Sequence, residues 1–282
     1  MKKVIIAILL IVTICSAVLA EENVKENQLI IRYIDVGQGD CSIIQYNDKV
    51  IMIDGGSREY NQKVYTVLKK ELNINSIDYM ISTHPHDDHI SGLMTAISVC
   101  DIGEIYTPVN DNSIEVIGEL AEKVKEKNTK VIVPEYGQKI YIGELVITFI
   151  SSPQPEWNVN DNSLIVRMDY RDTSFLFTAD AGWNAEQQLL ANNTNIKADV
   201  IKIGHHGSYD STSRGFLEEV NPKYAVISVG KDNSYGHPSD EVMQKLSEQK
   251  VTVYRTDKHG TITCISDGVN IKMETEKTNR KW

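Results

Sequence analysis

Thr83-His84-Pro85-His86-Asp87-Asp88-His89 is the stretch of sequence that decides the fold we expect for this chain. It directly follows the apolar run at residues 77–82, which predicts a short buried strand, so the cluster begins where that strand ends. In an extended backbone His84 and His86 alternate with Pro85 and can point the same way. Pro85 keeps His84 extended and removes one backbone donor. We therefore expect two imidazoles to converge on one point beyond the strand.

The second half of the same stretch adds oxygen donors to the imidazoles. Asp88 and His89 come after a turn and can face a second point in space. This spacing predicts two neighbouring metal sites, one rich in nitrogen and one with mixed nitrogen and oxygen ligands. The alternative is a polar loop in which histidines occur by chance. We disfavour it because clustered His and Asp beyond a buried strand are costly without a ligand that organises them.

Three further motifs occur with this cluster: Asp35-Val36-Gly37-Gln38-Gly39-Asp40, His205-His206-Gly207-Ser208 and Tyr235-Gly236-His237-Pro238-Ser239. The His-x-His-x-Asp-His pattern resembles the signature of the metallo-β-lactamase superfamily. All four motifs together resemble the hydrolase domain at the C-terminal end of ComEC-type DNA-uptake proteins and its free-standing relatives, over residues 29–273. The resemblance implies an α/β fold, the metallo-β-lactamase αββα sandwich, in which two mixed β-sheets pack face to face with helices outside.

The segments between the motifs alternate between strand patterns and helix patterns, and no internal repeat interrupts them. Apolar runs bounded by turn residues predict strands, among them residues 29–34, 49–53, 164–168 and 199–203. Helical spacing predicts helices at residues 62–72, 90–99, 113–127, 183–190, 213–220 and 240–249. This alternation agrees with the α/β class.

The resemblance implies a centre of two divalent metal ions, Zn²⁺ or Mn²⁺, built from loops that each follow a strand. In the family the two ions share a bridging aspartate, and each ion has its own further ligands. The implied ligands are His84, His86 and Asn162 for the first ion, Asp88, His89 and His205 for the second ion, and Asp180 as the bridge. An alternative role for Asp180 is to cap the helix predicted at residues 183–190.

One of these ligands departs from the pattern of the superfamily. Many members carry a metal-binding histidine just before the strand predicted at residues 164–168, and this chain has Asn160-Asp161-Asn162-Ser163 there. The DNA-uptake relatives also tend to have Asn-Ser at this point. An amide oxygen is a harder and weaker ligand than an imidazole, so Asn162 would favour Mn²⁺ or a loosely held first ion.

The two adjacent histidines of the third motif have roles that the sequence does not separate. In an extended backbone their side chains point in opposite directions. We assign His205 to the metal and His206 to catalysis, and an exchange of these two roles stays open. Asp88 and His237 are the other predicted catalytic residues, with His237 as a proton donor to the leaving group or as a contact to phosphate.

The remaining predicted site residues would contact the substrate or orient the ligands. The helix expected to begin at Ser239 offers an anion site at its N-terminus, and the alternative is an ordinary capped helix. The predicted substrate contacts are Ser208, Tyr235 and Ser239. By resemblance, Asp40 and Asp54 are expected to hydrogen-bond the ligating histidines and fix their orientation. For the glycine turns that contain these two residues, the alternative is turn chemistry alone.

The composition is that of a globular domain with an acidic balance. The chain has 282 residues, of which 41% are hydrophobic and 24% charged, and its formal net charge is -10. An acidic surface disfavours non-specific binding to long nucleic acid, which needs basic tracks. We therefore expect a phosphodiester or small-molecule substrate and no stable nucleic-acid complex, and the oligomeric state stays open.

The N-terminal segment predicts export from the cell. Two lysines precede an almost wholly apolar run at residues 4–14, and small residues end at Ala20, as in a secretory signal peptide at residues 1–20. The alternative is an uncleaved membrane anchor, although the apolar run is short for a span. The expected segments after the signal peptide are a linker at residues 21–28, the hydrolase domain at 29–273 and a polar tail at 274–282. We find no second hydrophobic segment that could cross a membrane, and expect a secreted protein.

The four cysteines give little support for a disulfide framework. Cys15 lies in the predicted signal peptide, which leaves Cys41, Cys100 and Cys264 in the mature chain. At most one disulfide could form among these three, and no Cys-x-x-Cys pair exists. We expect them to be small buried residues rather than metal ligands.

These expectations combine into a metal-dependent hydrolase. Two metal ions would lower the pKa of a shared water and give a hydroxide at neutral pH. No nucleophilic Ser or Cys is required, and no Gly-x-Ser-x-Gly elbow is present. The resemblance implies phosphodiester bonds as the target, as in a nuclease or a phosphodiesterase. The alternatives are hydrolysis of small esters, lactones or lactams, and a metal-binding protein without catalysis.

Overall fold

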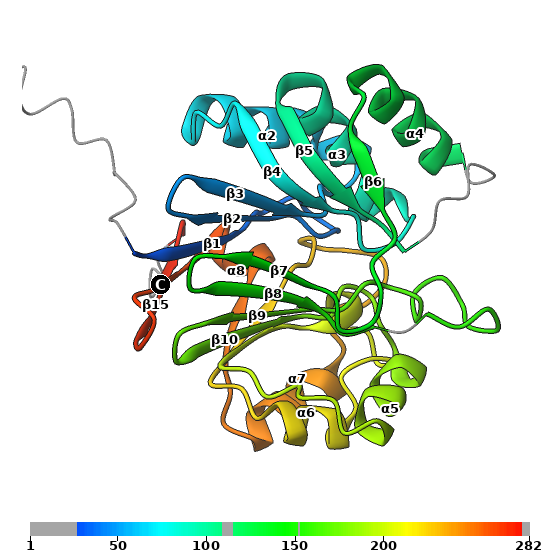
Figure 1. Ribbon diagram of the computed structural model, residues 1–282. Coiled ribbons are helices and arrows are strands. Elements are labelled where there is room, and N and C mark those ends of the chain that lie inside the picture. The colour runs from blue at the N-terminus through cyan, green and yellow to red at the C-terminus, as the bar shows by residue number, and fades with distance from the viewer. Residues whose placement is uncertain (1–26, 109–114, 152, 278–282) are drawn as a thin grey trace, which may run out of the picture.

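The computed structural model describes residues 27–108, 115–151 and 153–277. Within these ranges two mixed β-sheets pack face to face and helices cover both outer faces, which confirms the predicted αββα sandwich (Figure 1). The predicted signal peptide at residues 1–20 lies outside the described residues. Of the helices in the described part of the chain, none is both long enough and apolar enough to span a membrane.

The first sheet has eight strands among the described residues, in the order β15-β14-β1-β2-β3-β4-β5-β6. Neighbours from β15 to β3 pair antiparallel, and neighbours from β3 to β6 pair parallel. The strands are β1 (Leu29–Tyr33), β2 (Ser42–Tyr46), β3 (Lys49–Ile53), β4 (Ser76–Ile81), β5 (Asp101–Tyr106), β6 (Lys130–Ile132), β14 (Ile262–Ser266) and β15 (Ile271–Thr275). β15 thus continues two residues past the predicted end of the domain.

The second sheet has seven strands within the same ranges, in the order β13-β12-β11-β10-β9-β8-β7. Neighbours from β7 to β10 pair antiparallel, and neighbours from β10 to β13 pair parallel. The strands are β7 (Lys139–Ile142), β8 (Leu145–Phe149), β9 (Val166–Tyr170), β10 (Thr173–Phe177), β11 (Val200–Lys202), β12 (Tyr224–Ile227) and β13 (Thr252–Arg255). Each sheet therefore has a parallel part, and α/β folds place their sites at the carboxyl ends of such strands.

The helices form the two outer layers, with α2, α3 and α4 over the first sheet and α5, α6 and α7 over the second (Figure 1). Their bounds are α2 (Asn61–Thr66), α3 (Asp87–Val99), α4 (Glu115–Lys127), α5 (Trp183–Ala191), α6 (Arg214–Val220) and α7 (Asp240–Glu248). The described residues also form short helical segments, namely η1 (Arg58–Tyr60), η2 (Val67–Glu71), η3 (Gly204–Gly207) and α8 (Thr256–His259). The helix predicted at residues 62–72 is divided between α2 and η2, and sequence analysis missed α8.

Three apolar cores hold the layers together. The central core lies between the two sheets, where strand residues such as Ile31 and Phe175 are fully buried. The other two cores join each sheet to its own helices. Full burial of one such side chain stabilises the fold by roughly 1.5–3 kcal/mol. Cys41, Cys100 and Cys264 are buried and unpaired, in agreement with the prediction that they are small core residues.

Helix α3 begins three residues earlier than its apolar pattern predicts, at Asp87 instead of residue 90. Asp87 and Asp88 therefore lie in the first turn, where carboxylates interact favourably with the unpaired N–H groups of a helix N-terminus. The histidine motif is thus divided between the loop after β4, which carries His84 and His86, and the start of α3, which carries His89.

Two glycines let α3 lie directly against the loop that follows β3. Gly55 N donates to His89 O at 2.6 Å, and Gly92 N donates to Gly56 O at 3.0 Å. A Cβ on Gly92 would lie 1.9 Å from Gly55 O, so a larger residue could not fit there unless the helix moved. This close contact fixes His89 relative to Asp54, the first residue of the loop.

Candidate metal centre

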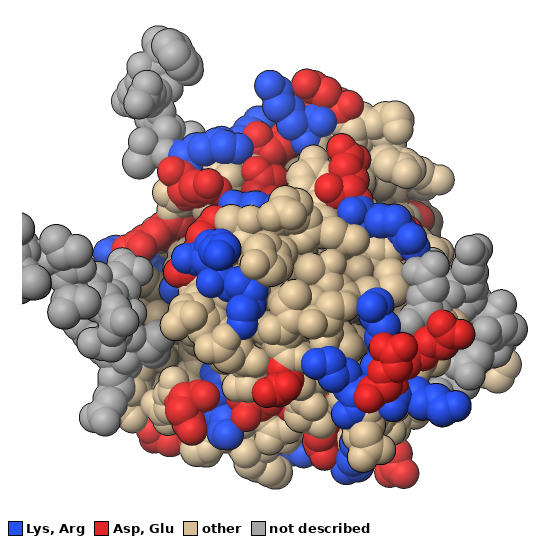
Figure 2. Space-filling model, turned by 90° about the horizontal axis from the view of Figure 1, so that it is seen from above, with Lys and Arg blue, Asp and Glu red and all other residues tan. Residues whose placement is uncertain are grey.

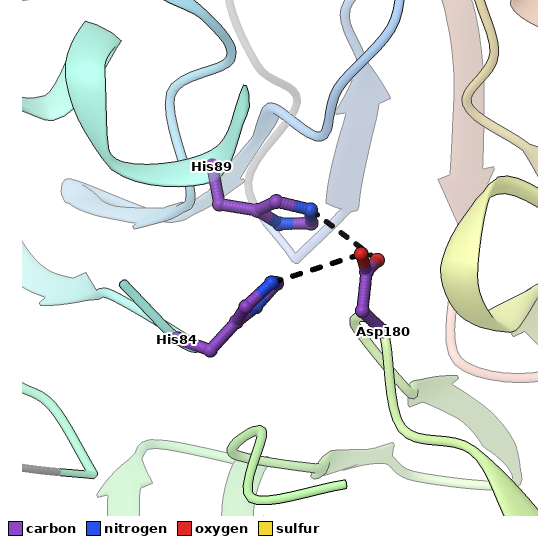
Figure 3. A group of neighbouring side chains, drawn as sticks. All are labelled: His84, His89 and Asp180. Atoms are coloured by element: carbon purple, nitrogen blue, oxygen red, sulfur yellow. Dashed lines mark ion pairs between the residues drawn. The ribbon is translucent and has the colours of Figure 1, made fainter. Parts of the chain in front are cut away.

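Asp180 lies at the centre of the histidine cluster, on the turn that follows β10. Its two carboxylate oxygens face different pairs of histidines, and we refer to these as the Oδ1 side and the Oδ2 side. Oδ1 lies 3.3 Å from His89 Nε2 and 3.7 Å from His206 Nε2. Oδ2 lies 3.7 Å from His84 Nε2 and 3.8 Å from His205 Nε2. Figure 3 shows His84 and His89 pointing toward this carboxylate from the strand end and the helix start.

The ring of His89 is held by a buried carboxylate from the neighbouring loop. His89 Nδ1 donates to Asp54 Oδ2 at 2.8 Å. Thr83 donates to the same carboxylate through its backbone N at 2.9 Å and through its hydroxyl at 2.7 Å. The proton of the neutral His89 ring therefore lies on Nδ1, and the lone pair of Nε2 faces Asp180. The structure thus brings Asp54 into contact with a predicted ligand.

The same threonine fixes the ring of His84. Because the Thr83 hydroxyl donates its hydrogen to Asp54, it can only accept from His84 Nδ1, which lies 3.1 Å away. His84 Nε2 then carries a lone pair, and it lies 3.0 Å from Nδ1 of His86. His84 is buried, whereas His86 is exposed. The two predicted ligands therefore lie together, and the unprotonated nitrogen of His84 faces Asp180.

His206, and not His205, lies beside Asp88 and His89. His206 Nε2 is 3.2 Å from Asp88 Oδ2, which is itself 4.0 Å from His89 Nε2. His206 Nδ1 donates to the backbone oxygen of Ser228 at 2.9 Å, so Nε2 faces the carboxylates, donating to Asp88 in the protonated ring and directing a lone pair at them in the neutral ring. The structure therefore favours the exchange of roles that the sequence left open, with His206 in the place predicted for His205.

The backbone of the two adjacent histidines explains why both rings face the centre. His205 has φ 47° and ψ 45°, and His206 has φ 54° and ψ 20°. The expectation that the rings point in opposite directions assumes an extended backbone, in which side chains alternate. In the left-handed conformation, which costs a non-glycine residue about 1–2 kcal/mol, this alternation is lost. Both Nε2 atoms consequently lie within 3.8 Å of the Asp180 carboxylate.

Asp40 contacts His206 and is itself paired with a buried lysine. Asp40 Oδ1 lies 3.3 Å from His206 Nδ1, and Asp40 Oδ2 lies 4.0 Å from His89 Nδ1. The ammonium group of Lys202, the last residue of β11, forms an ion pair with Asp40, and both side chains are buried. Sequence analysis missed Lys202, although a lysine inside an otherwise apolar strand is a signal that could have identified it.

Asn162, the third predicted ligand of the first ion, directs its amide at residues of its own loop. Its Oδ1 accepts from Gln154 N at 2.8 Å, and its Nδ2 donates to the backbone oxygens of Gln154 and Trp157. The amide is therefore used within its own loop. Asn160 approaches the centre instead, with its Nδ2 at 3.4 Å from His205 Nε2.

His237 and Tyr235 lie on the loop between β12 and α7, next to the paired histidines. The centroid of the His237 ring is 5.5 Å from that of His205 and 5.7 Å from that of Tyr235. Asn233 holds this loop, because its Oδ1 accepts from His237 N at 3.1 Å. Tyr235 is exposed and lines a pocket of about 810 Å³ that reaches Asp88. Both predicted residues thus lie at the edge of the centre, beside a pocket large enough for a small substrate.

The two serines predicted to contact substrate have other uses in the structure. Ser239 Oγ accepts from Val242 N at 3.3 Å and caps α7, which is the alternative that the sequence left open. Ser208 is buried, and its backbone N donates to His205 O at 2.8 Å. Ser239 therefore acts as the cap of α7, and Ser208 is a buried residue of the loop that carries the adjacent histidines.

The facing lone pairs at the centre repel each other, and a cation between them would remove this repulsion. His89 Nε2 and Asp180 Oδ1 are buried 3.3 Å apart, and neither forms a hydrogen bond of acceptable geometry within the described residues. Lone pairs of neutral imidazoles repel a facing carboxylate unless positive charge lies between them. Divalent ions with imidazole and carboxylate ligands suit this arrangement. The residues present therefore fit the metal ions that the motifs imply.

The pKa shifts of His206, His89 and Asp180 also indicate that positive charge is stabilised at the centre. Burial alone lowers the pKa of His206, but three facing carboxylates outweigh it and raise this pKa to about 9. Burial likewise lowers the pKa of His89, yet Asp180 and Asp54 raise it well above its usual value. For Asp180, burial raises the pKa and the facing histidines outweigh it, so the pKa lies well below its usual value. Protons and divalent ions therefore compete for the same positions.

The fold and the set of metal-binding residues define the class of protein. The family model described as the metallo-beta-lactamase superfamily matches residues 34–231, and the chain belongs to this superfamily as a metal-dependent hydrolase. Among solved structures, it is similar to the metallo-beta-lactamase fold protein YhfI from Bacillus subtilis, with a TM-score of 0.56 and 16% identity. That match covers 85% of this chain and 100% of YhfI, and at this identity it shows the fold alone.

Within this class the chain is similar to competence proteins. It is 30% identical over 247 residues to ComE operon protein 3 of Bacillus subtilis (strain 168), in a match that covers 81% of this chain and 32% of that protein. It is 26% identical over 244 residues to competence protein ComA of Neisseria gonorrhoeae, with 86% and 33% covered. The chain thus spans about a third of the length of these curated relatives. The resemblance to ComEC-type proteins is thereby confirmed.

Proposed function

We propose that the chain is a secreted metal-dependent hydrolase that acts on phosphodiester bonds. The observation that carries the proposal is the position of Asp180, whose two oxygens face separate pairs of imidazole nitrogens at 3.3–3.8 Å. Two divalent ions, Zn²⁺ or Mn²⁺, would fit on the two sides of this carboxylate. The similarity to competence proteins favours phosphodiester bonds over other targets.

The ligands that we propose are grouped by the oxygen of Asp180 that they face. On the Oδ1 side they are Asp88, His89 and His206, and on the Oδ2 side they are His84 and His86. Asp180 would contribute one oxygen to each side. Ions bound there would lower the pKa of a water and polarise the bonds of the attacked phosphorus.

The protein's own groups prepare the site for this chemistry. Asp54 and Asp40 contact the Nδ1 atoms of His89 and His206, which keeps their Nε2 atoms directed at Asp180. Burial raises the pKa of Asp88, but the neighbouring histidines outweigh it and hold this pKa far below its usual value. Asp88 is therefore ionised at neutral pH and can serve as a ligand, although so low a pKa makes it a weak base toward water.

His237 would contact the phosphate. Burial lowers the pKa of its ring, and the nearby His206 and His205 lower it further. The ring is consequently neutral at pH 7 and suits a hydrogen bond to a phosphate oxygen more than it suits a strong proton donor. Its Nδ1 is buried and has no hydrogen-bond partner within the described residues, so the ring has unused capacity for such a contact.

The pocket beside Asp88 favours a small or short substrate. Its volume is about 810 Å³, and charged side chains of both signs line it, among them Lys63, Lys231 and Glu59. On the face seen in Figure 2, Lys and Arg are interspersed with Asp and Glu around an uncharged area. Together with the net charge of -10, this pattern argues against a stable complex with long nucleic acid.

Hydrolysis of a small ester, lactone or lactam is the second candidate function. The pocket volume falls within the range of small-molecule sites, and an acidic surface does not repel a neutral substrate. The same carboxylates and imidazoles would act on a carbonyl carbon instead of phosphorus.

One experiment separates these functions. The purified protein is assayed with a model phosphodiester, a lactone and single-stranded DNA, each in the presence of Mn²⁺ and of Zn²⁺. We expect turnover of the model phosphodiester that Asp88→Ala abolishes and that Asp172→Ala, in the exposed turn between β9 and β10, preserves. Cleavage of the lactone alone would favour the second candidate. Metal uptake without turnover of any substrate would make the chain a metal-binding protein without catalysis.

Secretion has its own test. The proposal rests on the apolar segment at residues 4–14 and the small residues that end at Ala20. Expression in a bacterial host followed by N-terminal sequencing of the exported protein should give a mature chain that begins at Glu21. An uncut protein in the membrane fraction would instead support an N-terminal anchor.

A further inference from the structure

We infer that His205, oriented by Asp210, is the third imidazole ligand on the Oδ2 side of Asp180, together with His84 and His86. The inference rests on the proposed function in one respect, namely that divalent ions bind on both sides of this carboxylate. It concerns which residues hold the first ion and does not depend on the substrate.

Without His205, the two sides of Asp180 have unequal numbers of ligands. The Oδ1 side has a carboxylate and two imidazoles in addition to Asp180. The Oδ2 side would have only two imidazoles, because the amide of Asn162 is used within its own loop. One of these two imidazoles, that of His86, is exposed. A third imidazole would make the two ligand sets equal in size.

The backbone brings the ring of His205 to Asp180 at a conformational cost. His205 N donates to Ala179 O at 2.9 Å, which ties it to the residue before Asp180. Its left-handed backbone costs about 1–2 kcal/mol for a non-glycine residue. His205 Nε2 then lies 3.8 Å from Asp180 Oδ2, the oxygen that also lies 3.7 Å from His84 Nε2. Backbone strain of this kind is concentrated at functional sites, where the surrounding structure maintains it.

Contacts on both sides of the ring fix the tautomer of His205. Its Nδ1 lies 3.1 Å from Asp210 Oδ1, a carboxylate oxygen that accepts the Nδ1 proton. Asn160 Nδ2 lies 3.4 Å from His205 Nε2, and because an amide N–H can only donate, Nε2 is the acceptor. Nε2 therefore carries a lone pair, which an ion can bind in place of the Asn160 contact, as in other ligating histidines that a carboxylate orients.

This assignment predicts different metal preferences for the two sides. Three imidazoles and one carboxylate oxygen form a nitrogen-rich set that suits Zn²⁺. The Oδ1 side, with two carboxylates and two imidazoles, is richer in oxygen and accepts Mn²⁺ more readily. We therefore expect zinc to be held on the Oδ2 side, in contrast to the weak first site that an amide ligand would give.

The test counts zinc ions bound to the full chain and to three variants. His205→Asn removes the imidazole, and asparagine tolerates the left-handed backbone. Asp210→Asn offers an N–H to His205 Nδ1 and so favours the tautomer whose Nε2 carries the proton. His237→Asn is the matched control, because its ring neighbours His205 but is not among the ligands. Zinc is titrated into metal-free protein, bound metal is counted by mass spectrometry, and circular dichroism checks the fold.

We expect two zinc ions per chain for the wild type and for His237→Asn, and one for His205→Asn at the same free zinc concentration. In Asp210→Asn one of the two ions should bind about 10- to 100-fold more weakly. The Asp210→Asn result decides the question if His205→Asn does not fold. Wild-type affinity for both ions in the folded variants would overturn the inference, and so would loss of turnover with both ions retained, since His205 would then act on the substrate.

Failure of the proposed function would be seen separately from failure of this inference. Two ions in the wild type without phosphodiester turnover would overturn the proposed function and leave the ligand assignment intact. A wild-type chain that binds a single zinc ion, and a His205→Asn variant that keeps it, would overturn the ligand assignment whatever the substrate.

Discussion

The two sides of Asp180 differ in how far the protein fixes them before any ligand binds. On the Oδ1 side, the side chains of His89 and His206 are 0% and 2% exposed, and buried acceptors hold both Nδ1 atoms. On the Oδ2 side, His86 is exposed and the side chain of His205 is 23% exposed. The two imidazoles of the Oδ1 side are therefore preorganised, and we call this the fixed side, whereas His86 and His205 on the Oδ2 side are partly open to solvent. The pocket that reaches Asp88 opens the fixed side to substrate through that carboxylate.

Removal of the shared carboxylate should have the largest effect. Asp180→Ala takes one ligand from each side, so we expect both ions to be lost and phosphodiester turnover to fall at least about 10³-fold, or about 4 kcal/mol. Bound metal and steady-state kinetics are measured together. Asp172→Ala serves as the control and should keep both ions. One tightly held ion in Asp180→Ala would show that the fixed side does not need the bridge.

The next largest effect should come from the contact that fixes the Oδ1 side to the fold. In Gly92→Ala the new Cβ would lie 1.9 Å from Gly55 O, so α3 must move away from the loop that carries Asp54. We expect the free energy of unfolding in urea to fall by about 3 kcal/mol. Gly215→Ala, in α6, is the matched control, because its Cβ would meet only an ordinary contact at 3.9 Å. Equal stability of the two variants would contradict the role of the close contact.

Asp54→Asn should have a smaller effect, which is confined to the ion on the Oδ1 side. Its amide can donate to His89 Nδ1, which moves the ring proton to Nε2 and removes the lone pair that faces Asp180. We expect the ion on the Oδ1 side to bind about 10- to 100-fold more weakly, or about 1.4–2.7 kcal/mol, while the other ion keeps its affinity. Calorimetric titration with zinc resolves the two events. Equal weakening of both ions would mean that the two sides are not fixed independently.

The last effect concerns the stability of the fold near the loop that presents both adjacent histidines, and it leaves the ligands of both sides in place. Glu186 is buried and accepts from Thr212 N at 2.5 Å and from Ser213 N at 2.8 Å, just after that loop. Burial raises its pKa from 4.5 to about 7. Because the folded protein then binds more protons than the unfolded chain between pH 4.5 and pH 7, the unfolding free energy contributed by Glu186 falls as pH rises, by about 2 kcal/mol from pH 5 to pH 7.

Glu186→Gln has no ionisable group at this position and should lose that part of the pH dependence. Urea unfolding of both proteins at pH 5, 6 and 7 provides the comparison. The difference between the two unfolding free energies should change by about 2 kcal/mol across the series. A constant difference would show that Glu186 does not titrate in this window.

The architecture and the contact between Asp54 and His89 could be predicted largely from the sequence. The strand before Thr83 and the strand before Asp54 are clear apolar runs, and parallel neighbours end at the same edge of a sheet, so their polar residues meet. The pairing of Asp54 with His89 follows from this placement and from the resemblance. The early start of α3 was missed because Asp87 and Asp88 have weak helix propensity, whereas their position at the N-terminus stabilises them.

The parts of the site that depend on loop conformation could not be predicted. Nothing in the local sequence specifies a left-handed backbone at His205 and His206, and an extended backbone would have placed them on opposite sides. The choice between Asn160 and Asn162 depends on a loop whose hydrogen bonds are internal. The role of Asp210 could not be recognised from the sequence, because aspartate is common in turns.

Diffraction from crystals grown with Zn²⁺ or Mn²⁺, with data collected at the absorption edge of the metal, would test the central claim most directly. We predict two anomalous peaks, one beside each carboxylate oxygen of Asp180: one contacting His84 and His205, the other contacting His89 and His206. A map without a metal peak next to Asp180, from crystals of protein that hydrolyses a phosphodiester, would contradict the account.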